Sequence, residues 1–146
     1  MSNHAFLISI RPRFAEMIFT GSKTVELRRV CPKVSPGDLA LVYVSSPAKE
    51  LRGGFEVGKV ITASPSALWK TVGKKSGITR AEFLAYFYGK KQAHALIIKR
   101  AWALPTPVCL KTLRRKKGGF WPPQNFHYLR RTDSSLLTSL SVLQHN

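Results

Sequence analysis

The sequence predicts an α+β domain built around a small mixed β-barrel, with short helices on its rim. Short apolar runs typical of strands alternate with turn signals, helical spacing occurs only in brief stretches, and no regular strand-helix-strand rhythm runs through the chain. The 146 residues match one ordinary domain, and a hydrophobic content of 44% supplies a core. We expect one domain over residues 1–131, followed by a tail over 132–146 that is weakly ordered or a short helix.

The first half of the chain predicts one short helix among strands. Residues 6–10 form an apolar run, Pro12 suits the first turn of a helix, and Gly21 is placed to end that helix. Three further strands are expected between proline and glycine turns, over residues 23–29, 39–44 and 53–62.

Two helix starts are visible in the middle of the chain. Ser64 followed by Pro65 predicts one of them. Thr79 and Glu82 have the spacing of a capping box, which predicts a second helix that ends at Gly89.

The last part of the barrel is expected to be a strand over residues 93–102. Pro105 and Pro107 predict its end, and a short basic turn is expected over residues 110–115. His94 falls inside the apolar strand, so we interpret it as a packed or rim residue.

The charge of the chain is strongly positive and favours RNA as the partner. Lys and Arg number 24 against 7 Asp and Glu, which gives a formal net charge of +17. Such a charge attracts polyanions. The alternative is a solvated basic surface, or a basic protein-interaction module without a nucleotide pocket.

Several classes of protein are disfavoured by the sequence. The N-terminal apolar run is too short for a signal peptide and no stretch is long enough to span a bilayer, so we expect a cytoplasmic protein. Cys31 and Cys109 form no metal-binding pair, and carboxylates are scarce, so no metal or other cofactor is expected. The stretch from Gly53 to Lys59 has phosphate-loop spacing, but its strand-like alternation argues against an NTPase.

The segment over residues 21–29 combines a glycine turn with a charged strand. Side chains alternate across a strand, so Val25 and Leu27 are expected to face the core while Glu26 and Arg28 face the opposite side. Glu26 either forms a structural salt bridge or accepts a hydrogen bond from a base. The guanidinium of Arg28 suits a phosphate.

Lysines are the best candidates for chemistry. Burial and neighbouring cations disfavour the charged form of an amine, which frees it to act as a base or nucleophile. Lys23 and Lys49 fit this description, and the alternative is that both are solvated surface residues.

An aromatic and proline-rich segment over residues 118–128 follows a run of cations that includes Arg114. Its aromatic rings and amides suit the stacking and reading of unpaired bases. The alternative is that Trp121 and Phe126 plug the end of the barrel.

The order of these motifs resembles the ASCH family of the PUA-like superfamily, from about Phe6 to Leu129. Four blocks carry the resemblance: Ser9-Ile10-Arg11-Pro12 with Ala15-Glu16; Gly21 to Arg29; Tyr43 to Pro47 continuing through Gly54-Phe55-Glu56-Val57; and Pro122-Pro123-Gln124 with Phe126 and Tyr128-Leu129. The resemblance implies a PUA-like β-barrel, with a cleft between barrel and helices that binds RNA or modified nucleotides.

Members of the family differ in activity, so the resemblance leaves several functions open. Ribonuclease-like members are similar at Tyr43 and Lys49, while Asn125 stands where a hydroxyl residue is common. Members that hydrolyse N-acylated cytidines share Lys23, but Glu26 replaces their threonine, and Lys75-Ser76 stands where they have a glutamate.

We predict an RNA-binding protein that holds an unpaired nucleotide or single strand in a basic cleft, with metal-independent ribonuclease activity as the alternative. Tyr43, Lys49 and Lys23 are the candidate catalytic residues. The residues expected to contact RNA are Arg11, Lys23, Glu26, Arg28, Arg29, Tyr43, Ser45, Lys49, Trp121, Gln124 and Asn125.

Overall fold

The computed structural model describes residues 4–116 and 118–129, and the predicted tail over residues 132–146 lies outside them. The described chain contains both helices and strands, without a regular alternation of the two. In sequence they are β1 (Ala5–Ile10), α1 (Pro12–Thr20), β2 (Val25–Arg28), β3 (Leu39–Val44), β4 (Glu50–Ala63), α2 (Pro65–Val72), the short 3-10 helix η1 (Gly73–Lys75), α3 (Arg80–Tyr86), β5 (Ala93–Cys109), α4 (Leu110–Lys116) and β6 (Phe126–Tyr128).

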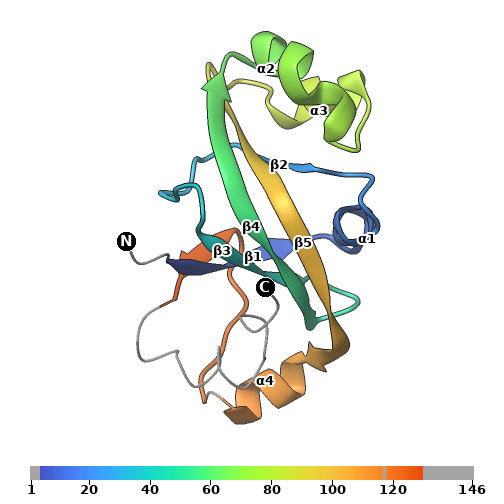
Figure 1. Ribbon diagram of the computed structural model, residues 1–146, viewed down its shortest axis with the longest axis vertical. Helices are drawn as coiled ribbons and strands as arrows, with labels where there is room; N and C mark the ends of the chain where they lie inside the picture. Colours follow the sequence, from blue (N-terminus) through green and yellow to red (C-terminus); the bar gives the residue numbers. More distant parts are fainter. Residues whose placement is uncertain (1–3, 117, 130–146) are drawn as a thin grey trace.

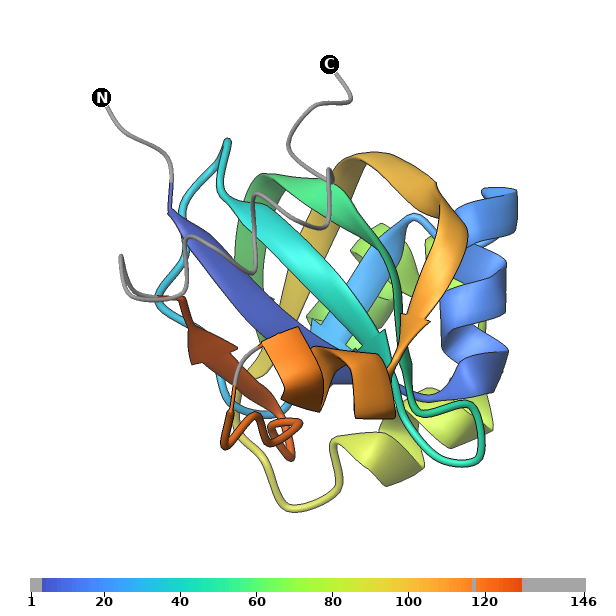
Figure 2. The same ribbon diagram turned by 90° about the horizontal axis from the view of Figure 1, so that it is seen from below.

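All the strands join one mixed sheet in the order β2-β5-β4-β3-β1-β6. β1 and β3 run parallel, and the other neighbours are antiparallel. β4 and β5 form a long ribbon with α2 and α3 at one end and α4 at the other (Figure 1). Seen from below, the sheet curls around its interior (Figure 2). The predicted α+β fold with a small mixed barrel and short helices is confirmed, as a curled half-barrel.

The core consists of three apolar clusters along the ribbon. The first lies between α1 and the sheet and includes Phe6, Ile18 and Phe55. The second packs α4 and Phe120 against β1 and β3. The third lies under α2 and α3 and includes Val25 and Leu27. Those two residues face the core, as strand alternation predicted.

The helix ends follow the predicted local signals. Gly21 ends α1 with φ of 87° and donates its N–H to the Ile18 carbonyl. Ser64 accepts the Ala67 N–H at the start of α2, and Thr79 forms the predicted capping box with Glu82. The end of α3 was predicted wrongly, because the helix stops at Tyr86 and a turn precedes Gly89.

The last long strand extends well beyond its predicted end. β5 runs to Cys109 and contains both Pro105 and Pro107. Its pairing with β4 jumps from Ala103 opposite Gly53 to Val108 opposite Leu51, so the prolines fall in an irregular stretch between paired residues. A proline there removes no hydrogen bond from the ladder, which is why it does not end the strand.

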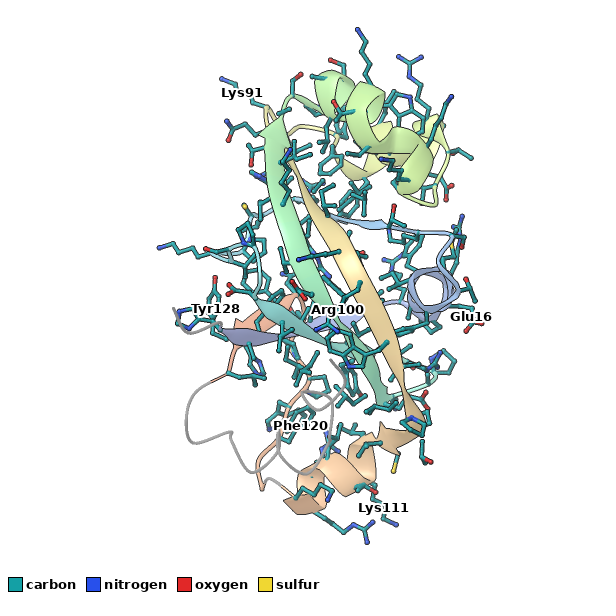
Figure 3. All side chains as sticks on the ribbon, viewed as in Figure 1. Glu16, Lys91, Arg100, Lys111, Phe120 and Tyr128 are labelled. Atoms are coloured by element: carbon teal, nitrogen blue, oxygen red, sulfur yellow. The ribbon has the colours of Figure 1, made fainter. Side chains whose placement is uncertain are left out.

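Two predictions for the C-terminal part of the domain were also wrong. The basic segment is the helix α4 rather than a turn, because its Leu113 is buried against the second core cluster. Trp121 does not plug the barrel, since it is 72% exposed, and the buried ring is that of Phe120, which lies between α4 and the sheet (Figure 3). Phe126 does pack against the core, as part of β6.

The first four strands differ from the predicted bounds only at their ends, whereas β6 was not predicted as a strand. β2 begins at Val25 and β4 already begins at Glu50. The glycine-rich stretch within β4 is extended and leads into no helix at Lys59, so it is not a phosphate-binding loop. None of the described helices is long and apolar enough to cross a membrane.

Gly53 allows β4 and β5 to approach closely, which gives a stability prediction. A Cβ atom at this position would overlap the Trp102 carbonyl oxygen and lie 2.9 Å from the Ala103 Cα, and both are backbone atoms. Gly53→Ala is therefore expected to lower the free energy of unfolding by about 2 kcal/mol. Gly118→Ala is the matched control, because its Cβ meets nothing within 4 Å. Urea unfolding followed by tryptophan fluorescence measures both variants, and equal midpoints would contradict the prediction.

Candidate functional site: a basic cleft

A cleft of about 890 Å³ opens between α3 on one side and the loop after α4 on the other. Residues at the ends of β1, β2 and β3 form its floor, and Leu110 and Arg114 of α4 complete its edge. Its volume is in the range of small-molecule and cofactor sites.

The structure brings the predicted site residues together around this cleft, with the exception of Arg29. The residues that line it are Arg11, Lys23, Glu26, Arg28, Tyr43, Ser45, Lys49, Trp121, Gln124 and Asn125. Arg29 lies outside and donates a hydrogen bond of 2.9 Å to the Tyr86 carbonyl. His94 also lies outside, with its Nδ1 2.8 Å from Thr62 Oγ1.

A buried group of three charged residues forms the floor. The carboxylate of Glu26 lies 2.9 Å from the Arg28 guanidinium and 3.7 Å from the Lys23 ammonium. All three side chains are more than nine-tenths buried. Lys23 donates to the Ser76 carbonyl at 2.6 Å and Arg28 to the Ser9 carbonyl at 3.1 Å. Of the two readings of Glu26, the geometry shows the salt bridge.

Arg28 also presents an unsatisfied donor. Its Nε is buried and has no hydrogen-bond partner in the described part of the chain, although the residue lines the cleft. Buried donors in folded proteins are nearly always paired, with protein, water or a ligand. An acceptor atom of a bound molecule would satisfy this N–H group.

Burial lowers the pKa of Lys23 below its ordinary value of 10.5. Loss of solvent is the largest cause, the nearby Glu26 opposes it, and Arg28 adds to the lowering. The Lys23 ammonium also lies 5.2 Å from the centre of the Phe14 ring, which partly replaces the lost water. Of the two lysines expected to be buried, Lys23 is buried, whereas Lys49 is exposed, as the alternative of a solvated lysine has it.

Tyr43 brings a phenol to the cleft from the end of β3. The residue is 2% exposed, and its ring packs 6.3 Å from that of Phe120. Burial raises the pKa of Tyr43, with a smaller opposing effect from the Arg114 charge. The phenol therefore keeps its proton at neutral pH and is a donor toward the cleft.

Lys49 occupies an unusual backbone position. Its φ is 51°, the one positive φ at a residue other than glycine in the described chain. Its carbonyl accepts the Leu110 N–H at 3.0 Å, which fixes the turn against the start of α4. The side chain is exposed and lines the cleft. A left-handed conformation costs about 1 kcal/mol for such a residue, and strain of this kind is concentrated at functional sites.

Ser9 holds the loop that closes one side of the cleft. Its hydroxyl donates to the Pro123 carbonyl at 2.5 Å, and its backbone N–H donates to the Asn125 carbonyl at 3.0 Å. Gln124 and Asn125 remain exposed at the cleft.

The cleft is electrostatically positive. Its cationic residues are Arg11, Lys23, Arg28, Lys49 and Arg114, against the two carboxylates of Glu26 and Glu82. Glu82 pairs with Arg13, which lowers the pKa of Glu82 to about 2, so both carboxylates already have cationic partners. In the described part of the chain, no three His, Cys, Asp or Glu side chains come together to hold a metal ion.

Of the cleft residues that were missed as site residues in the sequence, three bear on the chemistry of the cleft. Phe14 has the helical spacing of a core residue and packs against the first core cluster, but its ring also lines the cleft beside Lys23. Tyr86 lines the cleft from α3, and its hydroxyl donates to the Leu27 carbonyl at 3.3 Å. Arg114 was visible as part of a basic run, but that run contains no signal for which cation turns toward the cleft.

Glu26→Gln is expected to destabilise the protein strongly. The substitution leaves the Lys23 and Arg28 charges buried without a carboxylate, and breaking a buried ion pair costs about 3 kcal/mol or more. Glu16→Gln is the control, since the Glu16 side chain is 69% exposed beside Arg52 and such pairs contribute less than about 1 kcal/mol. Urea unfolding at neutral pH compares the variants, and similar losses for both would contradict the structural role of Glu26.

The lowered pKa of Lys23 predicts how stability changes with pH. Between the folded-state pKa and 10.5, the unfolded chain binds a proton at Lys23 that the folded chain has lost. The free energy of unfolding contributed by this residue therefore rises with pH across that window. The free energy of unfolding of the wild type minus that of Lys23→Met, measured from neutral pH up to about pH 10, is expected to rise with pH. Parallel pH curves for the two proteins would contradict it.

Comparison with known proteins and structures identifies the family to which the chain belongs. The model of the ASCH domain matches residues 8–105. An "ASCH domain-containing ribonuclease" of Zymomonas mobilis is 28% identical over 135 residues, which are 92% of this chain and 90% of that protein. The crystal structure of ASCH from Zymomonas mobilis superimposes with a TM-score of 0.88 at 27% identity, over 95% of this chain and 96% of that one.

A second relative shares only part of its length. The large ribosomal subunit protein uL22 of Ureaplasma parvum is 32% identical over 130 residues, which are 88% of this chain but 40% of that protein. The family model covers most of the described fold, from β1 into the irregular part of β5. The chain therefore belongs to the ASCH domain family.

Proposed function

We propose that the chain is a ribonuclease that binds single-stranded RNA in the basic cleft and cleaves it without a metal ion. The observation that supports this most directly is the convergence of five cations and a protonated phenol on one cleft, from segments far apart in the sequence. The similarity to a ribonuclease over nine-tenths of both chains supports cleavage over binding alone.

The proposed reaction is attack by the 2′-hydroxyl of RNA on the adjacent phosphate. A base removes the 2′-hydroxyl proton, the O2′–P bond forms, and the P–O5′ bond breaks. The leaving 5′-oxygen takes up a proton, and the products end in a 2′,3′-cyclic phosphate and a 5′-hydroxyl. Such a reaction needs a base, a proton donor and cations around the phosphate.

We assign these tasks to individual cleft residues according to the exposure and protonation of each side chain. We assign the role of base to Lys49, which reaches the cleft from the exposed turn after β3. Tyr43 is assigned as the proton donor, because its phenol lines the cleft and keeps its proton at neutral pH. The exposed guanidinium groups of Arg11 and Arg114 bind the phosphate oxygens, and the buried Arg28 adds its charge from the floor of the cleft. Lys23 is assigned to positioning, because its ammonium is already engaged by Ser76 and Glu26.

RNA binding without cleavage is the second candidate function. Asn125 cannot transfer a proton, so at this position the chain supplies a hydrogen-bonding amide in place of the hydroxyl found in ribonuclease-like members. Hydrolysis of N-acylated cytidines is less well supported, since Glu26 is held in ion pairs with Lys23 and Arg28.

Cleavage of labelled single-stranded RNA in EDTA tests the proposal. Purified wild-type protein is expected to produce fragments that end in a cyclic phosphate, and to leave an all-2′-O-methyl strand intact. Lys49→Ala is expected to lower the rate at least about 100-fold, as for loss of a general base. Lys70→Ala is the matched control, because Lys70 is an exposed lysine on α2 outside the cleft.

Lys49→Gly separates the chemical role of the lysine from a structural one. Glycine adopts the positive φ without strain, so this variant is expected to unfold at an equal or higher urea concentration than the wild type. Its rate is expected to fall as far as that of Lys49→Ala. Wild-type rates in both variants would point to a contaminating nuclease, and absence of cleavage with retained RNA binding would favour the second candidate.

A further inference from the structure

Two aromatic rings, one that lines the cleft and one on the turn after α3, are largely exposed. Trp121 is 72% exposed and Tyr88 is 83% exposed, the highest values among the large apolar side chains of the described residues. Exposed aromatic rings offer flat faces on which unpaired bases can stack. The proposed function uses neither ring for chemistry.

Trp121 lies on the loop side of the cleft. Its ring is stacked against the Arg114 guanidinium, whose carbon lies 4.9 Å from the ring centre. Arg114 Nε also donates to the Phe120 carbonyl, which ties the helix to the loop. One face of the indole is thus supported by a cation that also lines the cleft.

Tyr88 lies on the opposite side, directly after α3. Its N–H donates to the carbonyl of Ala85, and both Ala85 and Tyr86 line the cleft. The Tyr88 ring packs on no other aromatic ring in the described part of the chain. Arg29, which follows the cleft residue Arg28, is fixed beside this turn by its bond to the Tyr86 carbonyl. The Arg29 guanidinium keeps further N–H donors for a phosphate.

The charge pattern around the two rings favours a polyanion. Between Glu82 and Asp133 the sequence contains no carboxylate, and this stretch carries both Tyr88 and Trp121 together with Lys90 and Arg114. An extended single strand of nucleic acid presents alternating phosphates and stackable bases, which is the pattern that rings flanked by cations bind. A double strand would hide its bases from both rings.

We infer that the RNA strand crosses the cleft from one exposed ring to the other, with one flanking base stacked on Trp121 and another on Tyr88. Arg29 then contacts a phosphate outside the cleft, on the Tyr88 side. The inference rests on the proposed binding of RNA in the cleft, and it adds that the preferred substrate is an unpaired strand longer than the nucleotides that the cleft itself holds. The affinity for RNA and the rate of cleavage both increase with the length of the strand, until the strand is long enough to contact both rings.

Binding of strands of two lengths tests this inference. The probes are a fluorescein-labelled 2′-O-methyl uridine dinucleotide and a strand of about ten nucleotides, both resistant to 2′-hydroxyl attack, with anisotropy as the readout. Tyr88→Ala is expected to weaken binding of the longer strand about tenfold, the effect of one lost base stack, and to leave the dinucleotide unchanged. Tyr88→Phe retains the ring and is expected to bind like the wild type. Leu84→Ala is the control, since Leu84 is an exposed α3 residue outside the cleft lining.

The possible results separate this inference from the proposed function. Equal affinity of wild type and Tyr88→Ala for the longer strand would overturn the inference, while cleavage in EDTA would still support the ribonuclease. Equal affinity of the wild type for both lengths would also overturn it. A loss confined to the longer strand, in a protein that cleaves no RNA, would support the inference and overturn the catalytic role. Failure to bind either strand would overturn both.

Discussion

The cleft depends on one buried carboxylate. Lys23 and Arg28 would repel each other in a site with little water, and Glu26 between them makes their burial possible. The same two cations are bound to carbonyls of Ser9, in β1, and of Ser76, ahead of α3. One ion-pair group therefore joins β1, β2 and the helical side of the cleft. The ion-pair group therefore determines the shape of the cleft as well as its charge, because the cleft opens between the segments that it joins.

The position of the cleft follows from the direction of the strands. β1 and β3 are parallel, and Ile10 is aligned with Val44 at their carboxyl ends. The residues that follow, Arg11 and Ser45, are thus delivered to the same edge of the sheet, where Ser45 donates its N–H to the Ile10 carbonyl. Ligand sites commonly lie beyond the carboxyl ends of parallel strands. In this chain a single parallel pair, β1 and β3, delivers two cleft residues to the same edge of the sheet. The antiparallel strands of the sheet place the other cations around that edge.

Local patterns predicted much of this architecture, and long-range packing decided the rest. Period-two alternation predicted that Glu26 and Arg28 share a face, and by the same rule Arg29 faces away from it. The prolines of β5 were misread because their effect depends on how the strand pairs with β4, which the proline positions themselves do not reveal. Likewise, Phe120 and Trp121 are adjacent aromatics, and only the packing of α4 determines that the first is buried. The convergence of the cations was predicted from the family resemblance and the charge rather than from spacing.

The cleft combines two kinds of cation that do different physical work. Lys23 and Arg28 are buried and held at fixed positions by hydrogen bonds to backbone carbonyls, so their interactions mainly stabilise the floor of the cleft. Arg11 and Arg114 are exposed, and their long side chains remain able to follow a phosphate, whereas Lys49, which is also exposed, is the proposed base. The net charge of +17 attracts any polyanion, but salt screens that attraction beyond about 8 Å. At physiological salt the position of a bound polyanion would therefore depend on short-range contacts, and the cleft combines a protonated phenol with exposed cations.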